Sequence, residues 1–326
     1  MRIGLIGIGG IADVYRKGLA QYNQPITAVC DINQSRVDQI ASAENCAGYT
    51  DYREMLAKEN LDAVFISIPP GAHQNQVIDA VNAGVAVFVA KPVGLDIDLV
   101  ERTQAAITKS GVINQVGYMS RHSDMAAKAR ELIGDRKVVM GLGRFMVRMP
   151  AAHPWWGKRA LCGGQVIEQS THQFDFLRDI MGEVTEVHAY GHQGAGDDIA
   201  DFEDSTIVTM RFANGSMANV VSTSCTDVPE GCGWEFTGRD LYLKMIMDLD
   251  LSGVIDGKPV TYKGEESGYI RQVGEFLTAV STKNQAMIRS SYADAVKTLK
   301  VTMAAEQSMQ QGRPIKLSEL ELRITT

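Results

Sequence analysis

Two side chains able to carry protons, Glu168 and His172, stand four residues apart in the segment 163–172. On a helix, residues at this spacing share one face, so the two side chains would meet. They could act as an acid–base couple, serve as two metal ligands, or form an ordinary ion pair on a helix surface. Cys162 and His153 are the available further ligands, but their spacing matches no zinc pattern, so we expect no metal site.

Lys91 is a third candidate, because it directly follows the apolar run 85–90 and precedes a proline. Such a run is typical of a strand in a parallel sheet, and ligands of these sheets bind beyond the carboxyl ends of the strands. A lysine there is partly removed from water and can assist proton transfer. The alternative is a surface lysine at a strand end. Two more segments belong at the same edge: residues 69–73, with the sequence PPGAH, and Gly117-Tyr118.

The elements that must position these side chains begin at the amino terminus, with the apolar run 2–6 and the spacing Gly7-x-Gly9-x-x-Ala12. Apolar residues at helical spacing follow, so the segment predicts a strand, a tight turn and a helix. Gly7 permits the turn, Gly9 lets the backbone approach a pyrophosphate, and Ala12 lets the helix pack against the strand. The phosphates would lie at the amino terminus of that helix, where backbone N–H groups are available.

A second apolar run, 26–30, ends in Asp31. At the end of the second strand, a carboxylate can accept hydrogen bonds from the hydroxyls of adenosine ribose, and it repels a 2′-phosphate. This favours NAD over NADP, although Arg36 keeps NADP as the alternative. Together, the glycine spacing and Asp31 predict a dinucleotide-binding unit; a glycine-rich hairpin with a surface aspartate is the other interpretation.

The composition bounds the class of protein. The chain has 326 residues, of which 45% are hydrophobic and 22% charged, and its formal charge is −7. A single core stops growing near about 250–300 residues, so two domains are expected. The acidic balance argues against nucleic acid or an anionic membrane as the main partner. The five cysteines form no CxxC pair, and no apolar run approaches the about 18 residues that span a bilayer, so we expect a cytoplasmic protein with reduced thiols.

Strand-like and helix-like segments alternate through residue 119, which is typical of a doubly wound parallel sheet. In the second half, a helix is expected over 164–181. Beyond residue 184, β-rich runs are separated by turn signals such as Asn214-Gly215 and Asp256-Gly257, which favour antiparallel hairpins.

These two patterns predict an α/β protein built from two domains. Residues 1–120 would form a Rossmann domain that binds NAD on a doubly wound parallel sheet. Residues 121–326 would form an α+β domain with a large, mostly antiparallel open sheet.

The chain resembles the glucose–fructose oxidoreductase / inositol dehydrogenase / rhizopine-catabolism (Gfo/Idh/MocA) oxidoreductases over essentially its whole length. The resemblance rests on four motifs: the loop 7–12, Pro69-Pro70-x-x-His73, Lys91-Pro92, and Gly163-Gly164…Glu168-x-x-x-His172-x-x-Asp175. It implies reversible hydride transfer between NAD(P) and a hydroxyl or carbonyl of a sugar, polyol or related compound. It also implies that residues 121–326 are the substrate-binding and oligomerisation domain, with a homodimer or homotetramer assembled through the C-terminal sheet.

Carried over to this sequence, the resemblance implies that Lys91 hydrogen-bonds the reacting oxygen and helps hold the nicotinamide, while His172 removes the hydroxyl proton. Glu168 stands where inositol dehydrogenases commonly have aspartate, and it would hold a substrate hydroxyl or tune His172. The expected cofactor contacts are Gly7, Gly9, Gly10, Ile11, Asp31, Pro69, His73 and Lys91. The expected substrate contacts are Tyr118, Arg121, Trp155 and Trp156. The two tryptophans would form a platform for a sugar ring or, alternatively, pack in the core of the second domain.

One position departs from the family pattern. The family usually has Glu-Lys-Pro where this chain has Ala90-Lys91-Pro92. The missing glutamate normally supports the lysine and the nicotinamide, so slower chemistry or weaker cofactor binding is expected. Two alternatives to a dehydrogenase stay open: a glycosidase-type enzyme that transiently oxidises its substrate with a tightly held NAD, and a dinucleotide-binding sensor without catalysis.

Overall fold

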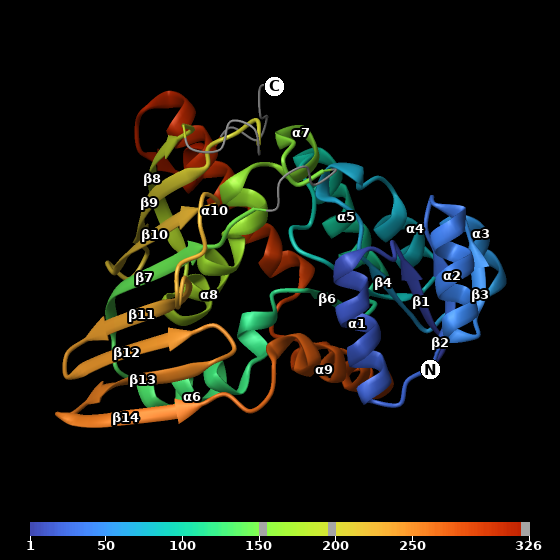
Figure 1. The fold of residues 1–326 in the computed structure, drawn as a ribbon, viewed down its shortest axis with the longest axis horizontal. Coiled ribbons are helices and arrows are strands. Elements are labelled where there is room, and N and C mark those ends of the chain that lie inside the picture. The colour runs from blue at the N-terminus through green and yellow to red at the C-terminus, as the bar shows by residue number, and fades with distance from the viewer. Residues whose placement is uncertain (150–154, 195–199, 321–326) are drawn as a thin grey trace. The chain divides into compact units, whose positions relative to one another are not determined.

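The computed structural model describes residues 1–149, 155–194 and 200–320. Figure 1 traces the chain through its helices and strands. The chain forms two units, each described here by itself. The N-terminal unit comprises Met1–His122 and Gly268–Ala295, and the C-terminal unit comprises Ser123–Ser267 and Val296–Thr326.

The N-terminal unit is built on a six-stranded sheet in the order β3-β2-β1-β4-β5-β6, in which all neighbouring strands are parallel. This is the strand order of a doubly wound dinucleotide-binding sheet, as the sequence predicted. The strands are β1 (Ile3–Ile6), β2 (Ile26–Cys30), β3 (Ala47–Tyr49), β4 (Ala63–Ile66), β5 (Ala86–Val89) and β6 (Asn114–Val116). The helices are α1 (Gly10–Gln21), α2 (Gln34–Glu44), α3 (Tyr52–Lys58), α4 (Gln76–Asn82), α5 (Ile97–Ser110) and α9 (Gly268–Thr282), with the 3-10 turns η1 (Pro70–Ala72), η2 (Met119–His122) and η4 (Gln285–Met287).

Local sequence explains how these helices begin and end. At the start of α5, the Asp96 side chain accepts hydrogen bonds from the backbone amides of Asp98 and Leu99. The helix ends at Gly111, whose φ of +66° is a left-handed conformation that glycine adopts without steric cost.

Helix α9 belongs to the N-terminal unit although it follows most of the C-terminal unit in the sequence. Its Phe276 ring packs edge-on against Phe65 and Phe88, with centroid distances of 5.4 and 5.5 Å. Helix α1 can approach closely because Gly18 faces Val273, and a Cβ atom on Gly18 would lie 2.9 Å from the valine Cγ2. The sequence predicted one boundary, between 120 and 121; the first boundary lies after residue 122, and α9 returns to complete the first core.

The C-terminal unit is built on a nine-stranded sheet in the order β14-β13-β12-β11-β7-β10-β9-β8-β15, in which only β7 and β10 pair in parallel among the described strands. Its strands are β7 (Val138–Met146), β8 (Val184–His192), β9 (Ser205–Phe212), β10 (Met217–Thr223), β11 (Cys232–Gly238), β12 (Leu241–Ile246), β13 (Asp250–Ile255), β14 (Lys258–Lys263) and β15 (Ile315–Lys316). Its helical segments are α6 (Asp124–Ile133), α7 (Arg159–Cys162), the π-helical turn η3 (Gln165–Gln169), α8 (Thr171–Met181), η5 (Leu317–Glu319) and most of α10 (Tyr292–Gln311). This confirms the prediction of a large, mostly antiparallel sheet.

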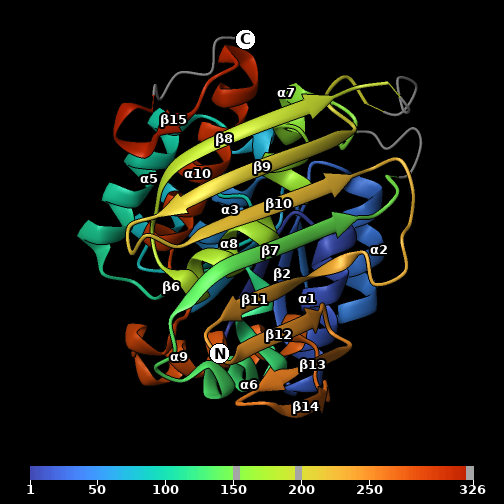
Figure 2. The ribbon, with the colours of Figure 1, turned by 90° about the vertical axis from the view of Figure 1, so that its left-hand side faces the viewer.

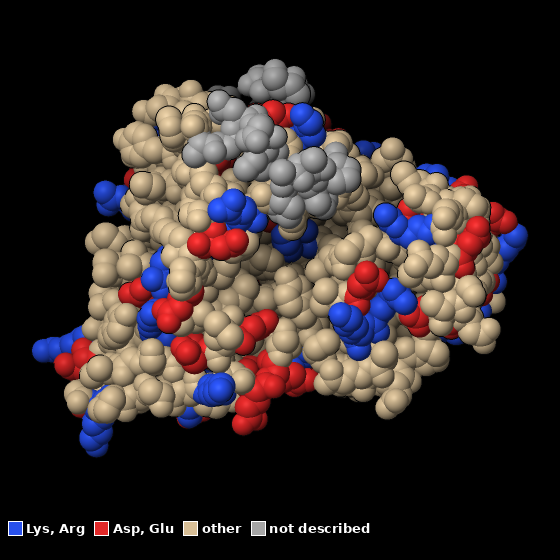
Figure 3. All heavy atoms as spheres, viewed as in Figure 1, with Lys and Arg blue, Asp and Glu red and all other residues tan. Residues whose placement is uncertain are grey.

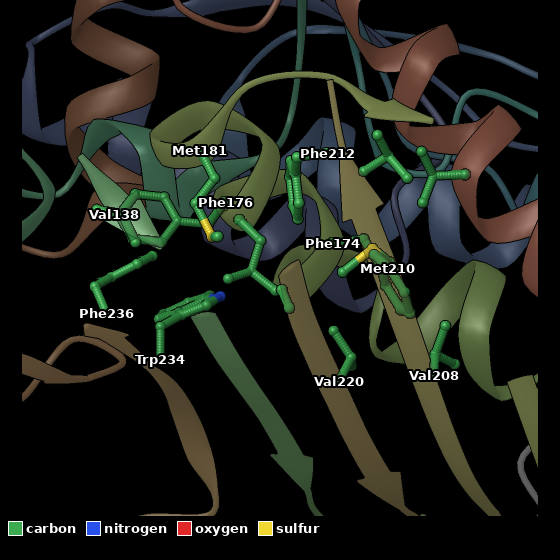
Figure 4. Packing of buried hydrophobic residues seen from close by; sticks show 14 of the residues in the cluster. Val138, Phe174, Phe176, Met181, Val208, Met210, Phe212, Val220, Trp234 and Phe236 are labelled. Atoms are coloured by element: carbon green, nitrogen blue, oxygen red, sulfur yellow. The ribbon is translucent and has the colours of Figure 1, made fainter. Parts of the chain in front are cut away.

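One face of this sheet forms the core of the C-terminal unit and the other is open. Figure 4 shows the packed face, where Phe176 meets Trp234 with ring centroids 4.9 Å apart. In β9, Val208 is buried whereas its neighbours Ile207 and Thr209 are exposed, so side chains alternate between the faces. Figure 2 shows the sheet from its open side, with no helix of the C-terminal unit in front of the described strands.

Candidate active site

The glycine loop joins β1 to α1 in the N-terminal unit. Gly7 has φ +79°, and a Cβ atom there would lie 2.4 Å from the carbonyl oxygen of Ser67, so only glycine fits. The Gly7 amide donates to the carbonyl of Cys30 over 2.8 Å, which fixes the loop against the end of β2. Gly9 precedes α1 without a side-chain cap, and no other atom lies within 4 Å of where a Cβ on Gly10 would stand. The amino terminus of α1 therefore presents bare backbone, as phosphate binding requires.

Asp31 follows β2 directly and is tied to this loop. Its Oδ2 accepts a hydrogen bond from the Ile8 amide over 3.1 Å, and its Oδ1 accepts one from the Asn33 amide over 3.0 Å. The Arg36 guanidinium lies 3.7 Å from Oδ2 and is half-exposed. The carboxylate and the guanidinium thus stand together beside the glycine loop, where they can discriminate between a ribose hydroxyl and a 2′-phosphate.

Two buried polar atoms at the carboxyl end of β4 have no hydrogen-bond partner among the described residues: Oγ of Ser67 and Nε2 of His73. Burial lowers the pKa of His73 to about 4, and a hydrogen bond to the backbone of Ile68 offsets only part of this effect. The imidazole is therefore neutral at physiological pH. Unsatisfied buried polar groups are costly, so a polar ligand at this edge would stabilise them. These atoms and the bare glycine loop fit a bound dinucleotide.

Lys91 is the second residue after β5, at the same edge of the sheet, and is half-buried. The peptide bond between Lys91 and Pro92 is cis. Ala90, in the place of the usual glutamate, is buried in the core cluster that includes Tyr15 and Phe88. Pro69 immediately precedes η1, and Ile11 lies within α1; both are half-buried. The predicted cofactor residues of this unit therefore all lie at or near the carboxyl ends of parallel strands β1, β2, β4 and β5.

Tyr118 and Arg121, the predicted substrate contacts in the N-terminal unit, are both buried. The Arg121 guanidinium lies 2.6 Å from the Asp294 carboxylate and donates to the carbonyl oxygen of Arg289 over 3.0 Å. These contacts tie η2 to the start of α10 within this unit, so Arg121 has a structural role. Its part in substrate binding, like that of Tyr118, stays a prediction.

Glu168 and His172 stand on a helical break in the C-terminal unit. The sequence predicts one helix over 164–181, whereas the structure has a π-helical turn, η3, followed by α8 from Thr171. Glu168 lies in the π turn and His172 in the first turn of α8, and both are buried, with 4% and 6% of their surfaces exposed. Single π turns often mark functional sites. A buried carboxylate and imidazole are not an ordinary surface ion pair.

A chain of hydroxyl groups connects this helical break to the nine-stranded sheet. Ser170 donates from Oγ to the carbonyl oxygen of Gln165, across the π turn, over 3.2 Å. Ser222 on β10 lies 3.5 Å from Ser170 and 2.6 Å from Thr206 on β9, oxygen to oxygen. All of these side chains are buried. The sheet therefore holds the residue at which the π turn ends and α8 begins.

Trp155 and Trp156 pack, half-buried, against a small cluster formed by Met149, Cys162 and Phe202. Their ring centroids are 5.8 Å apart. This position supports the packing role that the sequence left as an alternative. Since each indole is only partly covered, the platform for a sugar ring stays a prediction.

The sequence of each unit matches a known family. A sequence model described as "Oxidoreductase family, NAD-binding Rossmann fold" matches residues 1–118, and one described as "GFO/IDH/MocA C-terminal domain" matches residues 127–243. The myo-inositol 2-dehydrogenase of Thermotoga maritima is 30% identical over 336 residues, covering 98% of this chain and 99% of that one. The chain belongs to the Gfo/Idh/MocA oxidoreductase family.

Solved structures share the fold of this Gfo/Idh/MocA protein. The WlbA dehydrogenase from Bordetella pertussis, in complex with NADH and UDP-GlcNAcA, has a TM-score of 0.81 at 22% identity, covering 97% of this chain and 98% of that one. A levoglucosan dehydrogenase, in complex with NADH and levoglucosan, has a TM-score of 0.85 at 16% identity, covering 97% of this chain and 99% of that one. The protein is an oxidoreductase whose N-terminal domain is an NAD-binding Rossmann domain.

Three further observations on this family member concern metal binding, membrane-spanning helices and surface charge. Within residues 1–149, 155–194 and 200–320, no group of three or more His, Cys, Asp or Glu side chains could hold a metal ion. His153 lies outside those residues. No helix in the same ranges is long and apolar enough to cross a membrane. On the face shown in Figure 3, basic and acidic side chains of the described residues intermingle without an extended basic patch.

Sequence reasoning missed some residues of this site. Ser67 had a usable signal, because it is a polar residue in an apolar run just before Pro69. The ion pair of Arg159 and Glu306, which lies beside Gly164 before the π turn, had none, because the two residues are 147 positions apart and meet only in the folded C-terminal unit.

Proposed function

We propose that this protein transfers a hydride between NAD and a hydroxyl-bearing carbon of a sugar or cyclic polyol. The observation that best supports the proposal is the burial of Glu168 on a π turn and of His172 in the first turn of the helix that follows, in a chain with a complete glycine loop. A buried carboxylate that accepts hydrogen bonds, four residues before an imidazole that can accept a proton, suits a substrate with several hydroxyl groups. The names of the Thermotoga maritima relative and of the levoglucosan dehydrogenase support the same substrate class.

In this proposal each residue has one task. NAD, when bound, supplies the hydride acceptor. His172 takes the proton of the reacting hydroxyl, and Lys91 donates a hydrogen bond to the same oxygen as negative charge develops there. Glu168 accepts a hydrogen bond from a neighbouring hydroxyl, which orients the ring. Asp31 selects NAD rather than NADP by pairing with the ribose hydroxyls.

The first experiment is a titration of the purified protein with NADH and, separately, NADPH, followed by energy transfer from tryptophan to nicotinamide. Saturable binding of NADH, tighter than that of NADPH, is expected. A panel of inositols, other polyols and aldoses with NAD+ should then give NADH with at least one member. His172→Ala and Lys91→Ala should each abolish this turnover in folded protein. His188→Ala, a change on the sheet in β8, and Lys109→Ala, at the end of α5, are the matched controls and should keep it.

Each alternative function has its own outcome. A glycosidase-type enzyme would copurify with NAD and cleave glycosides without net formation of NADH. A sensor would bind the dinucleotide without turnover, and His172→Ala would leave it unaffected; the burial of Ala90 in the apolar core is the observation behind this alternative. Retained turnover in both the His172 and Lys91 variants would remove the assigned site.

We also propose that two copies of the chain pair through the open face of the nine-stranded sheet. Apolar side chains on that face are exposed on neighbouring strands: Tyr190, Ile207, Met217, Met140, Tyr242 and Val254. The strand register groups four of them in two pairs, since Ile207 is opposite Tyr190 and Met217 is opposite Met140. Exposed apolar patches of this kind are typical of interaction surfaces.

The oligomeric state tests this pairing. Light scattering after size exclusion should give a dimer or tetramer for the unchanged chain. Ile207→Lys together with Met217→Lys should give monomers that keep their helix and strand content. A monomeric unchanged chain would contradict the pairing.

The five cysteines are all free thiols, which supports a reducing compartment, the cytoplasm, as the place of action.

A further inference from the structure

An ion pair between the half-buried Arg159 and the buried Glu306 lies beside Gly164, the residue that precedes the π turn carrying Glu168. Arg159, the first residue of α7, contacts the Glu306 carboxylate on α10 over 2.5 Å, and its guanidinium also donates to Glu203. Only 4% of the Glu306 side chain is exposed. Since α7 has no other charged side chain, this pair fastens it to α10 and to the residues before β9.

The pair leaves little room for a side chain at Gly164, the residue that precedes the π turn. Gly164 has φ +98°, and a Cβ atom there would lie 3.1 Å from Nη1 of Arg159 and 3.3 Å from Oε1 of Glu306. Its carbonyl oxygen accepts a hydrogen bond from the Glu168 amide over 3.1 Å. Gly164 therefore links the ion pair to Glu168: it lies next to the pair, and its carbonyl oxygen binds the Glu168 amide.

Glu306 has a second unusual property. Its Oε1 atom is buried and has no hydrogen-bond partner among the described residues. Burial raises the pKa of Glu306 to about 7, although Arg159 opposes this; the nearby Glu203 carboxylate adds to it. Arg159 stays cationic, since its two carboxylate partners raise its own pKa. The charged groups that face Glu306 are thus Arg159 on α7 and Glu203 before β9, and the charge of the cluster changes near neutral pH.

We propose that Arg159 and Glu306 are positioning residues: their contact holds the Gly163–Gly164 turn, and through it the π turn that presents Glu168 and His172. The Arg159 guanidinium makes the contact that holds the turn. The protonation state of Glu306 determines how firmly the turn is held. Neither side chain is assigned a contact with substrate. The inference rests on the proposed function only for its catalytic readout, because the geometry of the turn can be measured directly.

The direct test is hydrogen exchange of the peptide that spans 163–172, corrected for intrinsic rates at each pH. Arg159→Met should lower its protection by about tenfold or more, and Arg159→Lys should restore part of it. In the unchanged chain, protection should fall about tenfold between pH 5.5 and 7.5, because opening lets the ionised Glu306 reach water. Glu306→Gln should lose this pH dependence. Asp179→Asn, which alters an ion pair with Arg130 at the far end of α8, is the control and should leave the peptide unchanged.

Three outcomes would overturn the proposal. They are unchanged protection in Arg159→Met, a pH dependence that persists in Glu306→Gln, and a loss spread evenly over the C-terminal unit, which would indicate a role in overall stability only.

The catalytic readout uses the polyol that the unchanged chain oxidises. Arg159→Met should raise KM and lower kcat while the Kd for NADH stays within about twofold, and Arg159→Lys should recover part of kcat. The pH profile of kcat/KM should lose an inflection near 7 in Glu306→Gln. If the unchanged chain neither binds NADH nor oxidises any polyol, the proposed function fails, whereas the exchange experiment still decides whether the turn is held by this pair.

Discussion

The backbone amide of Ile8 donates a hydrogen bond to Oδ2 of Asp31 over 3.1 Å. The carboxylate at the end of β2 is thereby joined to the loop that would carry the pyrophosphate. Asp31 thus anchors the glycine loop, and in the proposed function the same carboxylate binds the adenosine ribose and selects NAD. This double role makes the position sensitive to substitution in a way that can be measured.

Replacing Asp31 should change the preferred cofactor. In Asp31→Ala, NADH binding should weaken about tenfold, because the loop loses its anchor and the ribose loses its acceptor. NADPH binding should strengthen, because Arg36, 3.7 Å from Oδ2, becomes free to pair with a 2′-phosphate. The measurement is the ratio of the two Kd values. Adding Arg36→Gln should remove the gain for NADPH; a double variant that keeps the gain would show that Arg36 does not contact the phosphate.

Gly7 and Gly10 should respond differently to the same change. Gly7→Ala should reduce the free energy of unfolding by at least about 2 kcal/mol, because it combines a left-handed backbone with a contact of 2.4 Å to Ser67. Gly10→Ala has open space and should leave stability within about 0.5 kcal/mol. Denaturant unfolding measures both. Equal stability of the two variants would contradict the close approach of the loop to β4.

Phe276→Ala should destabilise the N-terminal unit specifically. The ring lies against Phe65 and Phe88 in the core, and truncation of a buried phenylalanine costs about 3–5 kcal/mol. Hydrogen exchange should become faster in β4 and β5, with little change in the nine-stranded sheet. NADH binding should weaken as well. Faster exchange confined to the C-terminal unit would mean that α9 is assigned to the wrong core.

His73 should make stability depend on pH on the acid side. Its pKa is lowered to about 4 in the folded chain, so between pH 6.5 and 4 the unfolded chain holds more protons. Stability should therefore be fully present above pH 6.5 and decline as the pH falls, by up to about 3 kcal/mol. In His73→Gln this component should vanish, and the difference between the two unfolding curves measures it. Parallel curves would show that the imidazole takes up its proton at the same pH in the folded and unfolded chains, and would contradict a lowered pKa.

Much of the first unit follows from local signals in the sequence. The run 26–30 predicts β2 to the residue, and Gly7 and Gly111 mark turns that only glycine adopts easily. These features depend on residues close together in the chain, so periodicity and turn chemistry are sufficient to find them.

The parts that sequence reasoning missed depend on distant partners. The π turn at Glu168 is held by Ser222 and Thr206 on two strands, and no local pattern encodes that contact. Strand β13 contains Ser252 and Gly253 and has little strand propensity of its own, so it forms because β12 and β14 flank it. Whether Arg121 is exposed or buried depends on its contact with Asp294, and only the folded chain brings these two residues together.

The return of α9 to the first core has a consequence for how the protein is made. During synthesis, Phe65 and Phe88 leave the ribosome long before Phe276, and the N-terminal unit is complete only at residue 295. Until then one side of its core lacks its covering helix, while most of the other unit has already emerged. A fragment that stops near residue 120 would keep this uncovered surface permanently. The nucleotide-binding half is therefore not a module that can be cut out or transplanted with a single break in the chain.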